Sequence, residues 1–163
     1  MNKIYKSAIL SLLFFIFLEI LASSVFVSLT GLNLDFSVLF CLYFCLKFEV
    51  EIAPYLILFI QWIHSLFSSL SWSLETCIGL FFIFIIKAFK ETLQLEGGRN
   101  RILIAFISYI LWYFVRYIIY YLNFSNLAYL KSQASYDFMS SLVITFSAIF
   151  IFKILDRIWS KSV

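Results

Sequence analysis

The chain has 163 residues, of which 64% are hydrophobic and only 13% are charged. Its mean hydropathy is +1.02 and its formal net charge is +3. Because soluble domains are about 45–50% apolar and about 25% charged, this composition excludes a soluble globular domain, a disordered chain and a basic nucleic-acid-binding module. The length allows about six spans of ~20 residues, with no room for a soluble catalytic domain.

Six apolar segments follow one another and cover residues 8–29, 34–46, 52–70, 72–89, 102–122 and 138–155. They predict an all-α integral membrane protein, a single polytopic domain whose six transmembrane helices form a compact bundle. The runs are continuous and do not alternate with polar residues, which disfavours a β-barrel. The first run resembles a signal peptide, but its 22 residues exceed the usual apolar core of ~7–15 residues, so we interpret it as a retained span.

The second segment is short, since 13 residues rise only about 20 Å and a hydrocarbon core is ~30 Å thick. The positive-inside rule nevertheless favours a crossing here. With six spans and both termini in the cytoplasm, ten of the 12 Lys and Arg residues fall inside, Lys131 falls outside and Arg116 lies within the fifth span. Without the second crossing, the basic loop 87–101 would move outside. We therefore predict six crossings, cytoplasmic N and C termini, and a polar outer loop over residues 123–137.

Few polar residues lie inside these spans, and each needs a partner because an isolated charge in lipid is costly. The candidates for an intramembrane polar cluster or for helix pairing are Glu19, His64, Glu75 and Arg116. One interpretation is a ligand site in the outer half of the bundle, in which Arg116 binds the carboxylate of Glu19, Glu75 or an incoming molecule. The alternative is an internal Arg–Glu pair that sets the register of two helices.

The fifth span carries a stripe of aromatic residues spaced by three or four, so that they share one helical face. Its members are Tyr109, Trp112, Tyr113 and Tyr120, with Arg116 among them. The stripe is a candidate docking face or an aromatic-lined pocket around a cation. Its last turn also fits an aromatic belt at the outer membrane interface.

The sequence contains no pattern typical of catalysis or of cofactor binding. There is one His, and no HExxH, GxSxG or phosphate-loop motif occurs. The three cysteines, Cys41, Cys45 and Cys77, lie in apolar runs and are expected to act as small hydrophobic residues, not as metal ligands or disulfide partners. We therefore predict a protein that is not an enzyme, with no metal and no cofactor.

Asp35 opens the short second segment, Tyr43 lies in its second half and Lys47 closes it, and a serine-rich stretch ends the third segment. With these features, residues 34–84 resemble the MreD family of rod-shape-determining membrane proteins. In that family a Pro-Asp pair opens a short second span that ends in an aromatic residue and a base; here Asp35, Tyr43 and Lys47 occupy those positions. The family's third span ends in an Asp and a Leu-Leu-Ser-Gly-like turn, and the corresponding positions here include Ser65, Ser68 and Ser69. At the corresponding positions of this chain, the Asp, the turn Gly and the Pro of the family pattern are missing. Its tyrosine-rich fifth span and basic C-terminal end are similar to the family's.

The resemblance implies a fold like the six-helix S-component of energy-coupling-factor transporters and a location in the bacterial inner membrane. It also implies a non-enzymatic scaffold of the cell-elongation machinery, or elongasome, that links cell shape to peptidoglycan synthesis in the cell wall. The implied partners are membrane lipid, an MreC-like single-span protein, MreB, and RodA with its transpeptidase partner, with no nucleic acid. The alternative function is the substrate-binding S-component of an energy-coupling-factor vitamin transporter. Against it, such subunits dock through small residues spaced four apart on the first helix, whereas the two alanines of span one, Ala8 and Ala22, are fourteen apart.

Overall fold

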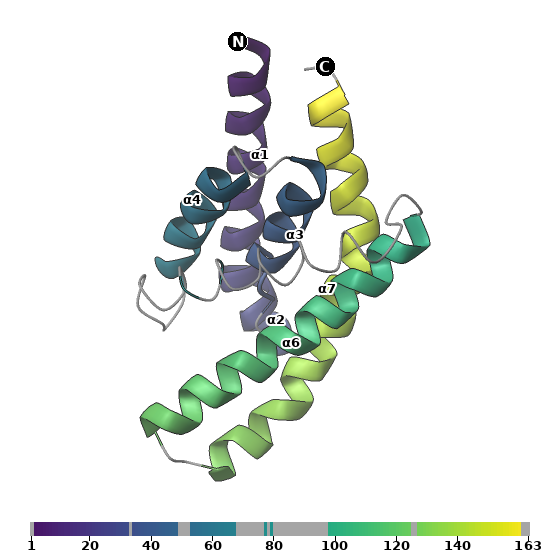
Figure 1. Cartoon of the computed structure of the whole chain (residues 1–163). Helices are drawn as coiled ribbons and strands as arrows, with labels where there is room; N and C mark the ends of the chain where they lie inside the picture. The colour runs from purple at the N-terminus through teal and green to yellow at the C-terminus, as the bar shows by residue number, and fades with distance from the viewer. Residues whose placement is uncertain are drawn as a thin grey trace.

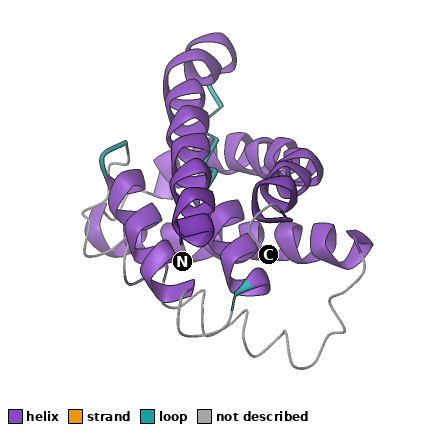
Figure 2. Ribbon diagram, turned by 90° about the horizontal axis from the view of Figure 1, so that it is seen from above, coloured by secondary structure: helices purple, strands orange, loops and turns teal. Residues whose placement is uncertain are grey.

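The computed structural model describes residues 2–32, 34–48, 53–67, 77, 79, 98–124 and 127–160. Within these ranges the chain is helical apart from short connections, and Figure 2 shows no strand in them. The predicted all-α class is therefore confirmed for the described part of the chain.

The first helix runs without a break from Asn2 to Thr30. It consists of α1 (Asn2–Leu21), one π-helical turn η1 (Ala22–Phe26) and α2 (Val27–Thr30). The helix ends at Gly31, whose φ of +70° is a left-handed conformation that glycine adopts without steric strain. This turn directs the chain back into the bundle, toward Asp35.

The short apolar helix α3 (Ser37–Lys47) lies in the centre of the molecule (Figure 1). Its residues 37–44 are all buried. The Phe40 ring lies 5.0 Å from the Phe15 ring of α1, and the Tyr43 ring lies 5.7 Å from the Phe152 ring of the last helix. A helix that is apolar on every side is expected to be surrounded by other helices, which explains why α3 can be shorter than the membrane is thick.

The remaining described helices are α4 (Ala53–Ser65), α6 (Gly98–Phe124) and α7 (Leu127–Ser160). Helices α6 and α7 pack against each other, while the C-terminal half of α7 returns alongside α1 (Figure 1). Residues 127–137, which we expected in an outer loop, are the first turns of α7. They contain no Gly or Pro and several good helix formers, so nothing local interrupts the helix there.

In the described part of the chain, three helical stretches are long and apolar enough to cross a membrane: Ile4–Thr30, Ile102–Ile119 and Phe138–Ser160. They correspond to the first, fifth and sixth predicted spans. With 11 and 13 residues, α3 and α4 rise only about 16 and 20 Å at ~1.5 Å per residue. Apart from positions 77 and 79, the predicted fourth span over residues 72–89 lies outside the described residues. Six crossings and the location of the termini therefore stay predictions.

The beginning of α1 and the end of α7 lie at the same end of the molecule (Figure 1). The Ser7 hydroxyl donates a hydrogen bond of 3.0 Å to the Ile158 carbonyl, and Trp159 Nε1 donates one of 2.9 Å to Ser11 Oγ. These hydrogen bonds join the beginning of α1 to the end of α7.

Candidate functional site

A cluster of four ionisable side chains lies inside the bundle, each from a different segment. Glu19 comes from α1, Asp35 from the turn before α3, His64 from the end of α4 and Arg116 from α6. Their side chains are 3%, 2%, 6% and 12% exposed, respectively. We call these four residues the polar cluster. Because buried charges in an apolar interior are stable only when paired, the cluster holds the four segments together.

Asp35 is the acceptor at the centre of the polar cluster. Its Oδ1 accepts hydrogen bonds from the backbone N–H of Ser37 at 3.0 Å and from the Ser37 hydroxyl at 2.6 Å, which satisfies donors at the start of α3. Its Oδ2 accepts a hydrogen bond of 2.9 Å from Trp112 Nε1. The Tyr109 hydroxyl donates to the Asp35 backbone carbonyl. Both the side chain and the backbone of Asp35 therefore bind α6.

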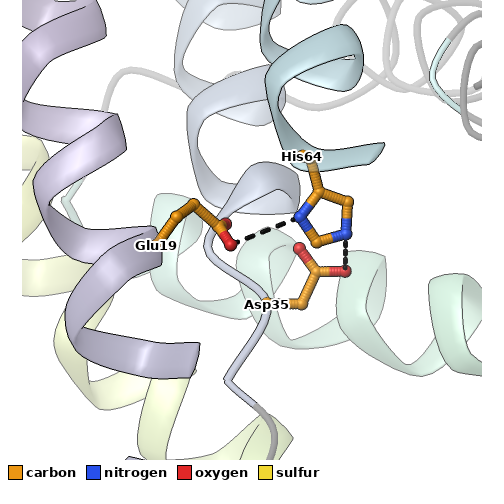
Figure 3. Close-up of side chains that lie close together, drawn as sticks. All are labelled: Glu19, Asp35 and His64. Carbon is orange, nitrogen blue, oxygen red and sulfur yellow. Dashed lines mark ion pairs between the residues drawn. The ribbon is translucent and has the colours of Figure 1, made fainter. Parts of the chain in front are cut away.

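The His64 ring lies between two carboxylates, as Figure 3 shows. Its Nδ1 is 3.4 Å from Glu19 Oε2, and its Nε2 is 3.4 Å from Asp35 Oδ2. The imidazole thus bridges α1 to the turn that precedes α3. A protonated imidazole carries an N–H on both sides and pairs with both carboxylates.

Arg116 supplies the permanent positive charge of the polar cluster. Its Nη1 lies 3.4 Å from Asp35 Oδ2, and its Nη2 lies 3.2 Å from His64 Nε2. The guanidinium carbon lies 5.5 Å from the centre of the Trp112 ring, within the range of a cation–π interaction. With both carboxylates ionised and His64 neutral, the four groups carry a net charge of −1; one proton on His64 makes them neutral.

The residues Glu19, Asp35 and His64 are also the set in the described part of the chain that could offer ligands to a metal ion, with one ligand atom each within 4.8 Å of the others. The geometry does not favour a chelate, because His64 turns opposite ring nitrogens to the two carboxylates (Figure 3). The Arg116 guanidinium next to Asp35 would also repel a cation. The arrangement is that of an internally paired ion cluster.

The residues of the aromatic stripe of α6 differ in how far the structure describes their surroundings. Tyr109 and Trp112 are 0% and 1% exposed and bind Asp35, so their polar atoms are used inside the chain. Tyr113 is also buried, with its ring 6.2 Å from the Tyr109 ring. Tyr120 belongs to α6, but its side chain lies outside the described part. The belt and docking functions of the stripe stay predictions.

The positions matched to the family pattern fall in separate places. Asp35 belongs to the polar cluster, whereas Tyr43 and Lys47 meet Asp156 of α7: the Tyr43 hydroxyl donates a hydrogen bond of 3.0 Å to Oδ1, and Lys47 Nζ lies 3.6 Å from the same atom. Ser65 Oγ donates a hydrogen bond to the Trp62 carbonyl at 2.7 Å. Three predicted residues, Glu75, Ser68 and Ser69, lie outside the described residues.

Two members of these networks were not singled out from the sequence. Ser37 follows Asp35 by two positions at the start of an apolar run, and this Asp-x-Ser pattern is a recognisable helix N-terminal signal. Asp156 sits one residue before Arg157 in the basic C-terminal end, and no local pattern indicates that it faces Tyr43. Its role depends on how α7 packs against α3.

Comparison with protein-family models, with curated proteins and with solved structures gave no match.

Proposed function

We propose that this chain is a non-enzymatic membrane scaffold that binds the transmembrane helix of a partner protein. The observation that carries the proposal is the contrast between its interior and its exterior. Inside, the ionisable groups of the polar cluster are paired with one another and bind the turn before α3 to α6. Outside, the described faces of the long helices carry large apolar side chains, which suit lipid and helix contacts.

Helix α6 offers one regular face of this kind. Five large side chains at spacings of three or four residues are 43–60% exposed: Leu103, Ile107, Ile110, Phe114 and Ile118. Residues with this spacing form one stripe along a helix, as a partner helix packing lengthwise requires. We propose this α6 stripe as the surface that receives a single-span partner.

The resemblance of residues 34–84 to the MreD family supports a specific form of this function. In that form the chain is an inner-membrane scaffold of bacterial cell elongation, the partner is an MreC-like single-span protein, and the assembly includes MreB and RodA with its transpeptidase partner. Asp35, a position of the family pattern, organises the bundle by linking the start of α3 to α6. No chemistry by the scaffold itself is needed in this function.

The test is mass spectrometry of the proteins that copurify with the tagged full chain from native membranes in mild detergent. We expect an MreC-like single-span protein together with wall synthases. Phe114→Ala should reduce recovery of that partner, whereas Phe146→Ala should not, because Phe146 is equally apolar and 69% exposed but lies on α7. Equal recovery with both variants would refute the α6 stripe, and absence of any single-span partner would refute the scaffold.

A second candidate function, the S-component of an energy-coupling-factor vitamin transporter, is favoured by one observation. Glu19 Oε1 is buried and has no hydrogen-bond partner among the described residues, so the polar cluster retains an acceptor that a ligand could use. Copurification of an ATPase with a transmembrane coupling subunit would favour this function over the scaffold. Binding of a small molecule should then be lost in Glu19→Gln, whereas Phe114→Ala should leave it unchanged.

We further propose that the chain is a multi-pass protein of the bacterial inner membrane with both termini in the cytoplasm. The shared end of α1 and α7 supports termini on one side, and the distribution of Lys and Arg supports the cytoplasmic side. Reporter fusions at each terminus that are active only in the cytoplasm or only in the periplasm test this. Opposite reporter results at the two ends would contradict an even number of crossings.

A further inference from the structure

A groove of about 600 Å³ opens between the first turns of α1 and the last turns of α7. This groove is remote from the polar cluster and shares no residue with it. The described residues that line it are Lys6, Ser7, Leu10, Ile154, Arg157, Ile158 and Ser160. The two helix ends that form its walls lie at the same end of the molecule (Figure 1).

The walls of the groove are held in place by hydrogen bonds between the two helices. Ser7, in one wall, donates to the carbonyl of Ile158, in the other, at 3.0 Å. One turn further along α1, Trp159 Nε1 donates to Ser11 Oγ at 2.9 Å, and both of these residues are buried. These contacts fix the spacing between α1 and α7, so the groove is a feature of the folded bundle.

The groove combines two positive charges with an apolar lining. Lys6 and Arg157 carry the charges, and no acidic residue of the described part of the chain lines the groove. Asp156, the carboxylate next in sequence to Arg157, faces α3 and pairs with Lys47. The other large lining side chains are Leu10, Ile154 and Ile158. This combination suits a ligand with an anionic head and an apolar tail.

The groove lies at the ends of two candidate membrane-spanning stretches, so a ligand with an anionic head and an apolar tail would come from the lipid bilayer. Lys6 and Arg157 lie near the ends of the helical stretches Ile4–Thr30 and Phe138–Ser160, which are apolar enough to cross a membrane. Basic side chains at this level meet the phosphates of lipid headgroups. Deeper along α1, Leu13 and Phe17 are each 57% exposed and continue the apolar surface from Leu10.

We propose that this groove is a binding site for one anionic glycerophospholipid. Arg157 and Lys6 bind the headgroup phosphate. The Arg157 guanidinium donates two N–H groups to it, and the Lys6 ammonium interacts with it as a point charge. One acyl chain lies along Leu10 and Ile154 and continues down the exposed face of α1. The lipid thus bridges the first turns of α1 and the last turns of α7 on the outer surface of the bundle.

The test uses the full chain in mild detergent and measures by native mass spectrometry the binding of dioleoyl phosphatidylglycerol, with dioleoyl phosphatidylcholine as the neutral comparison. The variant is Lys6→Gln with Arg157→Gln. The control is Lys47→Gln with Lys153→Gln, which removes the same charge from residues that do not line the groove. We expect the groove variant to bind phosphatidylglycerol roughly 30-fold more weakly, the factor that two basic contacts supply, and the control to bind as the wild type does.

A second measurement does not depend on the stability of the charge variant. A photo-cross-linking amino acid at Leu10, in protein reconstituted into phosphatidylglycerol–phosphatidylcholine nanodiscs, should yield an adduct enriched in phosphatidylglycerol. The same group at Phe150, which is 69% exposed on α7 and does not line the groove, should label the two lipids in their bulk ratio. Equal labelling at both positions, or equal weakening in the groove and control variants, would overturn the proposal. Protection of the site by inorganic phosphate alone would also overturn it, because the site would then recognise a free anion without the acyl chain.

Discussion

Trp112 Nε1 donates a hydrogen bond of 2.9 Å to Asp35 Oδ2, although the two residues are 77 positions apart in the chain. The same oxygen lies 3.4 Å from Arg116 Nη1 and 3.4 Å from His64 Nε2. One carboxylate oxygen therefore organises α4, α6 and the turn before α3. Asp35 is the residue on which the stability of the bundle is expected to depend most.

Asp35→Asn should lower the free energy of unfolding by about 3–5 kcal/mol, since it leaves the buried Arg116 charge without its counter-ion. The side-chain amide of this variant also places an N–H donor next to the donor group of Trp112 or Ser37, and two donors cannot form a hydrogen bond with each other. The measurement is the midpoint of thermal or denaturant unfolding in detergent micelles, followed by circular dichroism. A loss below about 1 kcal/mol would show that the Asp35–Arg116 contact contributes little.

Arg116→Gln combined with Asp35→Asn should destabilise the protein by less than the sum of the two single variants. Each single change leaves one buried charge unpaired, whereas the double change removes both, so we expect a coupling of about 0.5–3 kcal/mol. The control cycle pairs Arg116→Gln with Glu19→Gln, because Glu19 contacts His64 and no direct ion pair joins it to Arg116 among the described residues. Coupling that is larger in the control cycle would mean that Glu19 is the main partner of Arg116.

Trp112→Phe should lower the free energy of unfolding by about 1–3 kcal/mol in addition to the effect of the smaller ring on packing. The reason is that the buried carboxylate of Asp35 loses a hydrogen-bond donor. Trp62→Phe is the matched control, since Trp62 is 47% exposed on α4. Unfolding midpoints of the two variants make the comparison. Equal losses would indicate that the ring of Trp112, and not its N–H group, is what matters.

Gly79→Ala should destabilise the protein by about 1–3 kcal/mol through overpacking. A Cβ atom at position 79 would lie 2.8 Å from Gln61 Cγ, and the Gln61 side chain is fully buried and donates to Cys41 Sγ at 3.2 Å. In a Gln61→Ala background the same change should be nearly neutral, because the obstructing atoms are gone. If the cost persists in that background, the strain has another source.

Lys47→Gln should change the free energy of unfolding by less than about 1 kcal/mol. The Lys47–Asp156 contact is 3.6 Å long, and both side chains are about 40% exposed, so water already screens the pair. Tyr43→Phe should lower the free energy of unfolding by a similarly small amount, since the Tyr43 hydroxyl donates to the same half-exposed carboxylate of Asp156. Raising the salt concentration should reduce the effect of Lys47→Gln further, and a salt-independent loss would contradict a purely ionic contribution.

The helical class of this protein and the positions of its long apolar helices follow from composition and hydrophobic length alone. Lipid-compatible helices must satisfy their backbone hydrogen bonds internally, so continuous apolar runs predict helices without any tertiary information. The same reasoning singled out Glu19, His64 and Arg116, because a charge inside such a run requires a partner. The extent of α7 was missed because polarity across residues 127–137 was interpreted as a loop, although a helix tolerates polar residues where they meet water.

The tertiary structure decided which groups meet. Sequence spacing defines the face of one helix but not which face of another helix it contacts, and so the pairing of Asp35 with Arg116 could not be predicted. It also decided that α3 is surrounded by other helices, which removes the need for it to match the membrane thickness. The pairing of Asp156 with Tyr43 and the groove between α1 and α7 likewise depend on contacts between segments more than 100 residues apart. Such contacts arise only when the whole bundle packs.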